Sequence, residues 1–481
     1  MSKHCSRDNS GLQVGLAGYN IDSSLIAGIA GDNATPEVLA AAYARISRSP
    51  KSVNELRQEA LLELEKARRS NTRIIFELGH ASVAEHAVFN FDIIGVSRLL
   101  TETLETVRLA SFTEKSQRYV TFDPDFYCPP ELDASSLKNL KSEYLSTVAD
   151  LFKEYHASYQ ALAELYQQQY PQQNRVQREC MAKEDARYIL PLAAKTQLGM
   201  TINARSLENL LRRLAANPLN EAQDLHAKLL EPVKALCPSL VRYTDKETYA
   251  GGFAAPKLPV DEDDPDPGEA VRLVDMSQDP DTTILAALLY EQSASDFEHC
   301  RQKVKAMAPK DQQALWTQVF SGMQSWHKVH RAFELADFSF ELRMSESCWA
   351  QFKRHRMATM IRQPYPSSVH HTIPEAILTL GRDNAWDALV DRLENLAQGL
   401  RKVACDLSPY VRINASQVKV LAKMNLRELY HFVRLRSDEH AQWEIRQLSQ
   451  ELAGCIKVKS PQAAALLCGK SELQALLSQD E

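Results

Sequence analysis

Residues 86–97 read HAVFNFDIIGVS, a segment in which apolar side chains alternate with polar or small ones around Phe89 and Phe91. Strict alternation over this length predicts a β-strand with one buried face. Residues 335–345, LADFSFELRMS, repeat the pattern, with Phe338 and Phe340 in the matching places. A strand of the same kind is therefore expected once in each half of the chain.

The segments around these two strands also follow a common order, which is the signature of a repeat of whole-domain size. Each half begins with a strand-like run and an apolar helix, continues with the alternating strand, and later starts a helix at an Asn-x-Arg sequence. The paired segments are 12–20 with 270–276, 35–47 with 281–293, 86–97 with 335–345, and 201–214 with 423–449. Each segment of the last pair is expected to form one helix. Apolar residues at helical spacing in 142–165 and 386–407 predict long amphipathic helices. We expect an α+β fold of two tandem domains, each a small antiparallel sheet with long helices.

The expected domain boundaries follow from a change in composition. Residues 251–270 are rich in Pro, Gly and Asp and poor in large apolar side chains, as is typical of a linker. The two domains are therefore predicted at 1–250 and 271–481, and each is long enough to bury its own core.

Composition excludes several classes of function. Charged residues make up 25% of the 481 residues and the net charge is −6, so the chain as a whole does not predict binding to nucleic acid or to an anionic membrane. The nine cysteines are odd in number and form no Cys-x-x-Cys pair, which argues against a disulfide framework and a zinc site, and no metal is expected. The first residues lack the apolar core of a signal peptide, and no window reaches the ~18 apolar residues of a membrane helix. A cytoplasmic protein is expected.

A basic cluster, Arg354-His355-Arg356, interrupts the segment FKRHRMATMIRQPY at 352–365. Neighbouring side chains on one helix point to different faces, so the three groups gain nothing from pairing with each other. Two interpretations remain open: a solvated basic turn, which is the common role of a short basic run, or a binding site for an anion.

Several ordered motifs accompany this cluster. The first half contains GHASVAEHAVFNFDIIGVSR at 79–98 and RLASFTEKSQRY at 108–119, and the second contains QFKRHR at 351–356 and HAQWEIR at 440–446. Both halves resemble the flavin-dependent (alternative) thymidylate synthases, whose signature is Arg-His-Arg-x-x-Ser-x-Asn-x-x-Ser-x-Arg-Tyr with Ala-Gln-Trp-Glu-Ile later in the chain. The ordered set is far more specific than any one motif.

Each half departs from the family signature in a different part. The first half has Thr103 for the Gln and Thr106-Val107 for the leading Arg-His, but it keeps Arg108, Ser111, Glu114, Ser116, Arg118 and Tyr119. The second half is the reverse: it keeps Gln351 and the Arg-His-Arg cluster, and it has lost the rest to Ile361, Arg362, Pro364, Pro366 and Ser367.

The later motifs divide in the same way. Arg187 matches a family substrate arginine and aligns with Pro409, whereas Arg436 matches another and aligns with Leu214. We align AQWEIR at 441–446 with a degraded AQDLHA at 222–227.

The resemblance implies a composite site. In the family, the pockets of a tetramer lie at subunit interfaces, where one chain supplies the serine and arginines that hold the nucleotide and a neighbour supplies the Gln and a further arginine. Complementary loss suggests that the first half keeps one set and the second half the other. The expected substrate-binding residues are Ser116, Arg118 and Arg187 with Gln351 and Arg436, and Ser116 and Arg118 are the catalytic candidates.

The resemblance also implies FAD as cofactor, with NADPH and methylenetetrahydrofolate as co-substrates. Arginine suits phosphate because its planar fork bonds two oxygens and stays charged. The family pattern places the cofactor near His80, Ser82, Glu85, Arg108, Asn203, Arg205, Asn209, Arg354, His355, Arg356, Asn425, Arg427 and His440. Two chains are expected to pair as a homodimer, which gives four family-like units in a pseudo-tetramer.

Alternatives remain at the level of residues and of function. His80 and His86 fit structural histidines, Glu85 fits a first-turn helix acid, and Asn-x-Arg fits a helix start. The leading function is one-carbon transfer to a pyrimidine nucleotide such as deoxyuridylate. The alternatives are a catalytically inactive paralogue that binds FAD or a nucleotide, and a flavoenzyme with another nucleotide or carbon donor.

Overall fold

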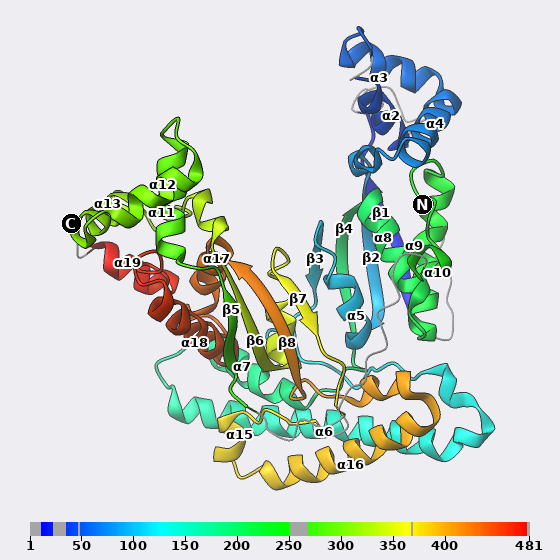
Figure 1. Cartoon of the computed structure of the whole chain (residues 1–481). Coiled ribbons are helices and arrows are strands. Elements are labelled where there is room, and N and C mark those ends of the chain that lie inside the picture. The colour runs from blue at the N-terminus through cyan, green and yellow to red at the C-terminus, as the bar shows by residue number, and fades with distance from the viewer. Residues whose placement is uncertain (1–10, 23–34, 47–48, 251–267, 367–368, 479–481) are drawn as a thin grey trace. The chain divides into compact units, whose positions relative to one another are not determined.

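The computed structural model describes residues 11–22, 35–46, 49–250, 268–366 and 369–478 (Figure 1). The chain forms two compact units, residues 1–260 with 373–414, and residues 261–372 with 415–481. Most of the expected linker lies outside the described residues. The predicted boundaries at 250 and 271 concern the repeat in the sequence, whereas the compact units also assign 373–414, which belongs to the second repeat, to the first unit.

The first unit contains a four-stranded antiparallel sheet with the strand order β1-β2-β4-β3. Its strands are β1 (Gln13–Tyr19), β2 (Val88–Ser97), β3 (Ala110–Glu114) and β4 (Lys195–Asn203). The predicted alternation is confirmed in β2, where Phe89, Phe91 and Ile93 are buried and Asn90 and Asp92 are exposed.

The second unit contains an equivalent sheet with the strand order β5-β6-β8-β7. Its strands are β5 (Val271–Met276), β6 (Asp337–Ser345), β7 (Thr359–Arg362) and β8 (Gln417–Asn425). The register agrees as well: Phe89 lies opposite Ile202 and Phe338 lies opposite Met424 at matching positions. The expected α+β fold of two tandem domains is confirmed.

The rest of each unit is mainly helical. In the first unit the helices are α2 (Glu37–Arg45), α3 (Val53–Leu62), α4 (Leu64–Thr72), η2 (Arg73–Glu77), η3 (Ala81–His86), α5 (Arg98–Glu105), η4 (Pro130–Asp133), η5 (Ser135–Leu137), α6 (Lys138–Gln169), α7 (Arg175–Ala186), η6 (Arg187–Ile189), α8 (Ala204–Ala216), α9 (Asn220–Leu236), α10 (Lys246–Ala250), α15 (Glu375–Thr379), α16 (Asp383–Ala404) and η8 (Cys405–Val411). In the second unit they are α11 (Pro280–Glu291), α12 (Phe297–Ala306), α13 (Pro309–Phe320), η7 (Arg331–Leu335), α14 (Glu346–Phe352), α17 (Leu426–Arg436), α18 (Trp443–Lys459) and α19 (Lys470–Ser478). Among the described helices, none combines the length and the hydropathy that crossing a bilayer requires.

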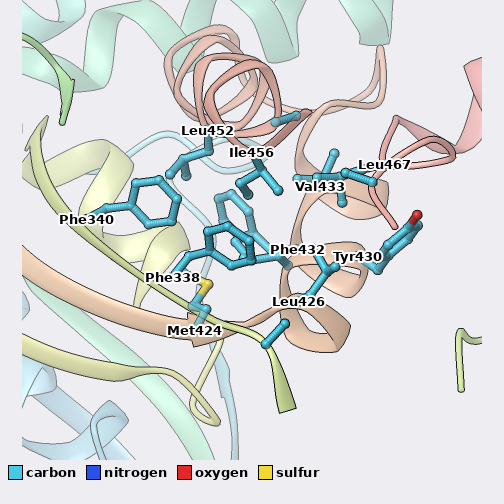
Figure 2. Close-up of a cluster of buried hydrophobic side chains, with 14 of the residues drawn as sticks. Phe338, Phe340, Met424, Leu426, Tyr430, Phe432, Val433, Leu452, Ile456 and Leu467 are labelled. Carbon is cyan, nitrogen blue, oxygen red and sulfur yellow. The ribbon is translucent and has the colours of Figure 1, made fainter. Parts of the chain in front are cut away.

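The core of the second unit shows how a sheet and helices bury one face each. Phe338 and Phe340 extend from β6 toward Phe432 of α17 and Leu452 of α18 (Figure 2). All four side chains are fully buried. Helix α17 begins where the Asn425 side chain accepts a hydrogen bond from Glu428 N at 2.9 Å, as is typical of an N-cap. The same core includes Leu467 from the chain beyond α18.

The predicted continuous helix through 423–449 is wrong. The structure ends α17 at Arg436 and starts α18 at Trp443, with an intervening turn. Gln442 caps α18, because its side chain accepts a hydrogen bond from Ile445 N at 3.2 Å. A side-chain cap of this kind satisfies backbone donors that a continuous helix would not leave open.

Each repeat joins its second strand to a later helix through a serine and a glutamate. Ser97 N and Oγ both donate to Glu221 at 2.6 Å, and Ser345 N donates to Glu444 at 2.8 Å. Glu221 therefore corresponds to Glu444. The alignment of AQDLHA at 222–227 with AQWEIR was wrong by four positions, because the shared Ala-Gln pair masked the single retained acid.

The central strands β2 and β6 differ near their C-terminal ends, because only β2 contains a bulge there. β2 contains a bulge between Ile94 and Val96, where Gly95 has a φ of 78°, whereas β6 pairs with β8 without interruption. A Cβ atom at Gly95 would lie 2.5 Å from the Gly11 carbonyl oxygen. The bulge therefore requires glycine.

Within the first unit, the long helices of the two repeats pack together. α6 and α16 lie side by side (Figure 1). Arg382 makes hydrogen bonds to both carboxylate oxygens of Glu154, at 2.8 and 2.9 Å, and Trp386 Nε1 donates to Ser158 Oγ at 3.2 Å. The second repeat thus contributes a helix to the unit that holds the first repeat.

A buried ion pair occurs with opposite polarity in the two repeats. Arg98 follows β2 and lies 3.3 Å from Glu114 of β3, whereas Glu346 follows β6 and pairs with Arg362 of β7. Ser97 and Ser345 precede the pair, and both pairs connect the helix start to the outer strand of the sheet. In both repeats a cation and an anion pair between the helix start and the outer strand, but the position that carries the cation is exchanged.

Candidate functional site

The first-repeat set, Ser116, Arg118 and Arg187, lies together in the first unit. Arg118 N donates to Ser116 Oγ at 3.2 Å, and Arg118 Nε donates to Glu184 on α7. Arg187 Nε donates to the Glu184 carbonyl oxygen at 3.3 Å. Glu184, which the sequence did not single out, therefore positions both arginines, one through its carboxylate and the other through its backbone.

Arg187 is an unusual arginine because only 6% of it is exposed. Its Nη2 atom is buried and has no hydrogen-bond partner among the described residues. Burial lowers the pKa of Arg187 from its ordinary value, and the nearby Arg118 and Arg98 lower it further, while Glu184 opposes the shift. A buried cationic donor without a partner fits a site that receives an anionic or carbonyl oxygen.

Two buried amides complete this cluster, and the sequence did not single out either. Asn414 Nδ2 donates to Gln117 Oε1 and to the Arg187 carbonyl oxygen, both at 2.9 Å. Gln117 is next to Ser116 in the chain, whereas Asn414 belongs to the second repeat. No motif signals Asn414, because it aligns with Leu192 of the first repeat and lies in a loop.

The second-repeat set, Gln351, His355 and Arg436, lies together in the second unit. Arg436 Nε is 3.1 Å from His355 Nε2, and Arg436 Nη2 donates to the Gln351 carbonyl oxygen at 3.2 Å. Gln351 Nε2 donates to Gln442 Oε1 at 3.3 Å. The Gln of the Ala-Gln-Trp-Glu-Ile motif therefore both caps α18 and holds Gln351, while Leu219 occupies the equivalent cap of α9 in the first repeat.

His355 is held as the neutral ring. Its Nε2 accepts from Arg436, which has only donors, so a proton on His355 has to lie on Nδ1, 3.6 Å from Glu428 Oε1. The pKa of His355 is lowered from its ordinary value, mainly by burial and further by Arg436 and His431, and Glu428 acts in the opposite direction.

This lowered pKa predicts a pH dependence of stability. An unfolded chain protonates His355 near pH 6.5 and the folded chain only at lower pH, so the unfolded state binds more protons as the pH falls through 6.5. Folding stability should fall by up to about 1.4 kcal/mol for each pH unit below that point, the limit for one proton. Denaturant unfolding of wild type and His355→Gln at pH 7.5 and 5.5 tests this, because the variant should lose that part of the slope. Equal slopes would contradict it.

The predicted cofactor residues of the first unit gather at the start of α8. Arg205 Nη1 lies 2.6 Å from Glu85 Oε1 on η3, and Asn203 caps α8 by accepting from Ser206 N at 2.8 Å. His80 and Ser82 are exposed around η3, Arg108 is exposed just before β3, and Asn209 is exposed on α8. The helix-start role is confirmed for Asn203, whereas Glu85 lies near the end of η3 and not in its first turn. The exposed Arg205 and Arg108 form a cationic edge here.

The equivalent edge of the second unit borders a cavity of about 570 Å³. Arg427 Nη1 lies 2.8 Å from Glu334, in the manner of Arg205 with Glu85, and Asn425 lines the cavity beside it. The other lining residues include Trp326, His327, Arg331, Met357, His431 and Arg434. Arg434 donates to the His327 carbonyl oxygen at 3.0 Å, yet its Nε and Nη2 atoms are buried without a hydrogen-bond partner among the described residues.

The remaining predicted cofactor residues of this unit are less enclosed. Arg354 is exposed, Arg356 is half-buried, and His440 is exposed in the turn between α17 and α18. The Arg-His-Arg run thus separates: His355 faces the interior beside Arg436, and Arg354 faces solvent. The described residues that line a larger cavity of about 790 Å³ between α13 and α19 include no acidic, basic or histidine side chain, so they offer no charged group to a phosphate.

Comparison with known proteins now decides the family. The sequence profile described as "Thymidylate synthase complementing protein" matches residues 30–239 and again residues 272–462. The chain belongs to this thymidylate synthase family. The two matches follow the two repeats and confirm the resemblance that the motifs indicated.

Similar proteins fall into two groups. A flavin-dependent thymidylate synthase of Clostridium tetani is 33% identical over 220 residues, which cover 45% of this chain and 85% of that protein. Another, of Geobacter sulfurreducens, is 31% identical over 208 residues, covering 43% of this chain and 81% of that protein. A UPF0159 protein of Thermoplasma acidophilum is 24% identical over 438 residues, covering 82% of this chain and 87% of that protein.

In the second repeat, the segment around Arg362 departs from the family signature and packs against its neighbours. Arg362 pairs with the buried Glu346 and lies over the rings of Trp349 and Tyr365, with its guanidinium carbon 5.9 and 5.0 Å from their centroids. Tyr365 Oη donates to the same carboxylate. In the second repeat, the segment that departs from the family signature is therefore held by an ion pair and by packing against two aromatic rings.

Proposed function

We propose that the protein is a flavin-dependent thymidylate synthase-like enzyme that transfers a one-carbon unit to a pyrimidine nucleotide such as deoxyuridylate. One observation carries the proposal: each repeat keeps a compact set of family site residues where the other repeat has apolar or rebuilt positions. Arg187 corresponds to Pro409, and Arg436 corresponds to Leu214, which is fully buried. This distribution supports a site in which the two sets complete each other.

The first-repeat set binds the nucleotide in this proposal. Arg118 and Ser116 bind phosphate oxygens, and Arg187 donates from a buried position to the pyrimidine. Donors in a site of low polarity stabilise negative charge as it develops on the ring more strongly than donors in water. Gln351 and Arg436 of the second-repeat set complete the nucleotide site, and two chains pair as a dimer to form it.

The chain's residues fit FAD as the cofactor. A dinucleotide needs cations for its diphosphate and flat side chains for its rings, and the 570 Å³ cavity offers Arg331, Arg427 and Arg434 with Trp326 and His431. Arg354 and Arg356 lie on the same repeat, and Glu85 with Arg205 offers an equivalent edge on the other. When bound, the flavin supplies the electrons, with NADPH as reductant and methylenetetrahydrofolate as carbon donor.

The proposal predicts a flavin stoichiometry and a cation dependence. FAD should bind at about one per chain, because only one kind of composite site retains both sets. Arg354→Ala should weaken FAD about tenfold, the loss of a charge-assisted contact. Flavin absorbance in titrations of wild type, Arg354→Ala and the surface control Arg301→Ala measures both. Two tight flavins per chain would contradict the composite site.

A turnover assay tests the proposed enzymatic activity directly. With FAD, NADPH and methylenetetrahydrofolate, the protein should convert deoxyuridylate to thymidylate, detected by chromatography of the nucleotides. Binding of both ligands without product would identify an inactive binding paralogue, an alternative favoured by the rebuilt segment around Arg362. Product from another nucleotide would identify a different substrate.

A further inference from the structure

The first-repeat set has a contributor from outside the first repeat. Asn414 follows η8 in the second repeat, and the backbone there pairs with the equivalent segment of the first repeat. Leu192 N donates to the Arg412 carbonyl oxygen at 2.7 Å, and Asn414 N donates to the Leu190 carbonyl oxygen at 2.9 Å. This pairing lies within the first unit and fixes the backbone of Asn414 beside Arg187. Only 2% of Asn414 is exposed.

The contacts of Asn414 determine the orientation of its amide. The Arg187 carbonyl oxygen can only accept a hydrogen bond, so the Asn414 atom at 2.9 Å from it has to be Nδ2. The same Nδ2 lies 2.9 Å from the Gln117 amide, and a donor requires an acceptor there, which is Oε1. Gln117 Nε2 therefore points away from Asn414.

Gln117 consequently presents a donor. Its Nε2 atom is buried and has no hydrogen-bond partner among the described residues. Only 7% of Gln117 is exposed. Arg187 Nη2 is in the same state. Buried donors are nearly always paired in folded proteins, so two unpaired donors held in one cluster indicate an acceptor supplied by a ligand.

We propose that Gln117 Nε2 donates to a ring carbonyl oxygen of the pyrimidine nucleotide, and that Asn414 is a positioning residue that keeps this amide in the donating orientation. The inference rests on the proposed function, since it assigns a contact within that nucleotide site. A neutral amide suits a neutral carbonyl better than a phosphate, for which Arg118 is available. The second repeat thus helps to define the base-binding part of the first-repeat set.

Two isosteric variants test the inference. Gln117→Glu keeps the Oε1 acceptor for Asn414 and replaces the donor with an acceptor. Asn414→Asp cannot donate to Gln117 Oε1, so the Gln117 amide turns and presents Oε1 to the ligand. Each should weaken deoxyuridylate binding about tenfold or more in calorimetric titration, with FAD binding unchanged. Asn139→Asp, which adds the same charge on the exposed surface of α6, should bind deoxyuridylate as wild type does.

A second ligand separates base recognition from phosphate recognition and from a structural role. Deoxyribose 5-phosphate lacks the base, so its affinity should stay within about twofold of wild type in both variants. Equal weakening of both ligands would overturn the proposal, because it would mean that the variants act on the phosphate or on the fold. Unchanged deoxyuridylate binding would overturn it too, whereas a wild-type protein that binds no deoxyuridylate would refute the proposed function itself.

Discussion

Arg98→Glu should destabilise the first unit by about 3–5 kcal/mol, the cost of leaving a buried charge without its partner. The substitution places a new carboxylate beside Glu114 and Glu102, which now lie 3.3 and 3.4 Å from the Arg98 guanidinium, and all three side chains are at most 13% exposed. The midpoint of urea-induced unfolding, followed by the circular dichroism of the helices, measures the loss.

The second repeat supplies the compensating change. It has Glu346, Ala350 and Arg362 at the positions of Arg98, Glu102 and Glu114, so the triple variant Arg98→Glu/Glu102→Ala/Glu114→Arg copies a pair that already exists in the chain. Most of the lost stability should return, because residues in direct contact couple strongly. A triple variant no more stable than Arg98→Glu alone would show that the two pairs are not equivalent.

The sequence predicted the parts of the fold that depend on periodicity. Alternation around Phe89 and Phe338 identified β2 and β6, one central strand of each sheet. The order of segments identified the repeat. The prediction failed where a single polar residue decides the outcome. The break after Arg436 depends on Gln442 as a cap, and a continuous helical pattern hides such a cap. The role of Glu221 was missed because its neighbours changed while the acid stayed.

The residues of the candidate site also fall into those that the sequence could predict and those that it could not. Family motifs led to Arg118, Arg187, Gln351 and Arg436, and the structure gathers them into two compact sets. Motifs could not lead to Asn414, which contacts residues far from it in sequence and has an apolar counterpart in the other repeat. Nor could they show that Arg362 is a paired residue, since its partner Glu346 lies on the helix before the signature. Contacts between distant segments carry no local pattern.

Arg118→Ala and Arg436→Ala should each weaken deoxyuridylate binding about ten- to a hundredfold, because each removes a charge-assisted contact worth roughly 1.5–3 kcal/mol. Calorimetric titration of each single variant and of the double variant measures the effect. If both arginines bind one nucleotide, the double variant should lose less than the sum of the two single losses. Full additivity would argue for two independent sites.

Control substitutions for this experiment should be made at exposed residues, because changing a buried residue alters folding stability. Leu214 aligns with Arg436 but is fully buried, so Leu214→Ala would be measured as a loss of about 2–5 kcal/mol in folding stability and not as a binding effect. Pro366, which is exposed and aligns with Arg118, and Arg272, which forms an exposed ion pair with Glu341, are better choices. Pro366→Ala and Arg272→Ala should leave nucleotide affinity within about twofold, since proline has no donor for a phosphate and Arg272 lies outside both sets of site residues. A comparable loss in Arg272→Ala would mean that overall charge, and not the retained arginines, governs binding.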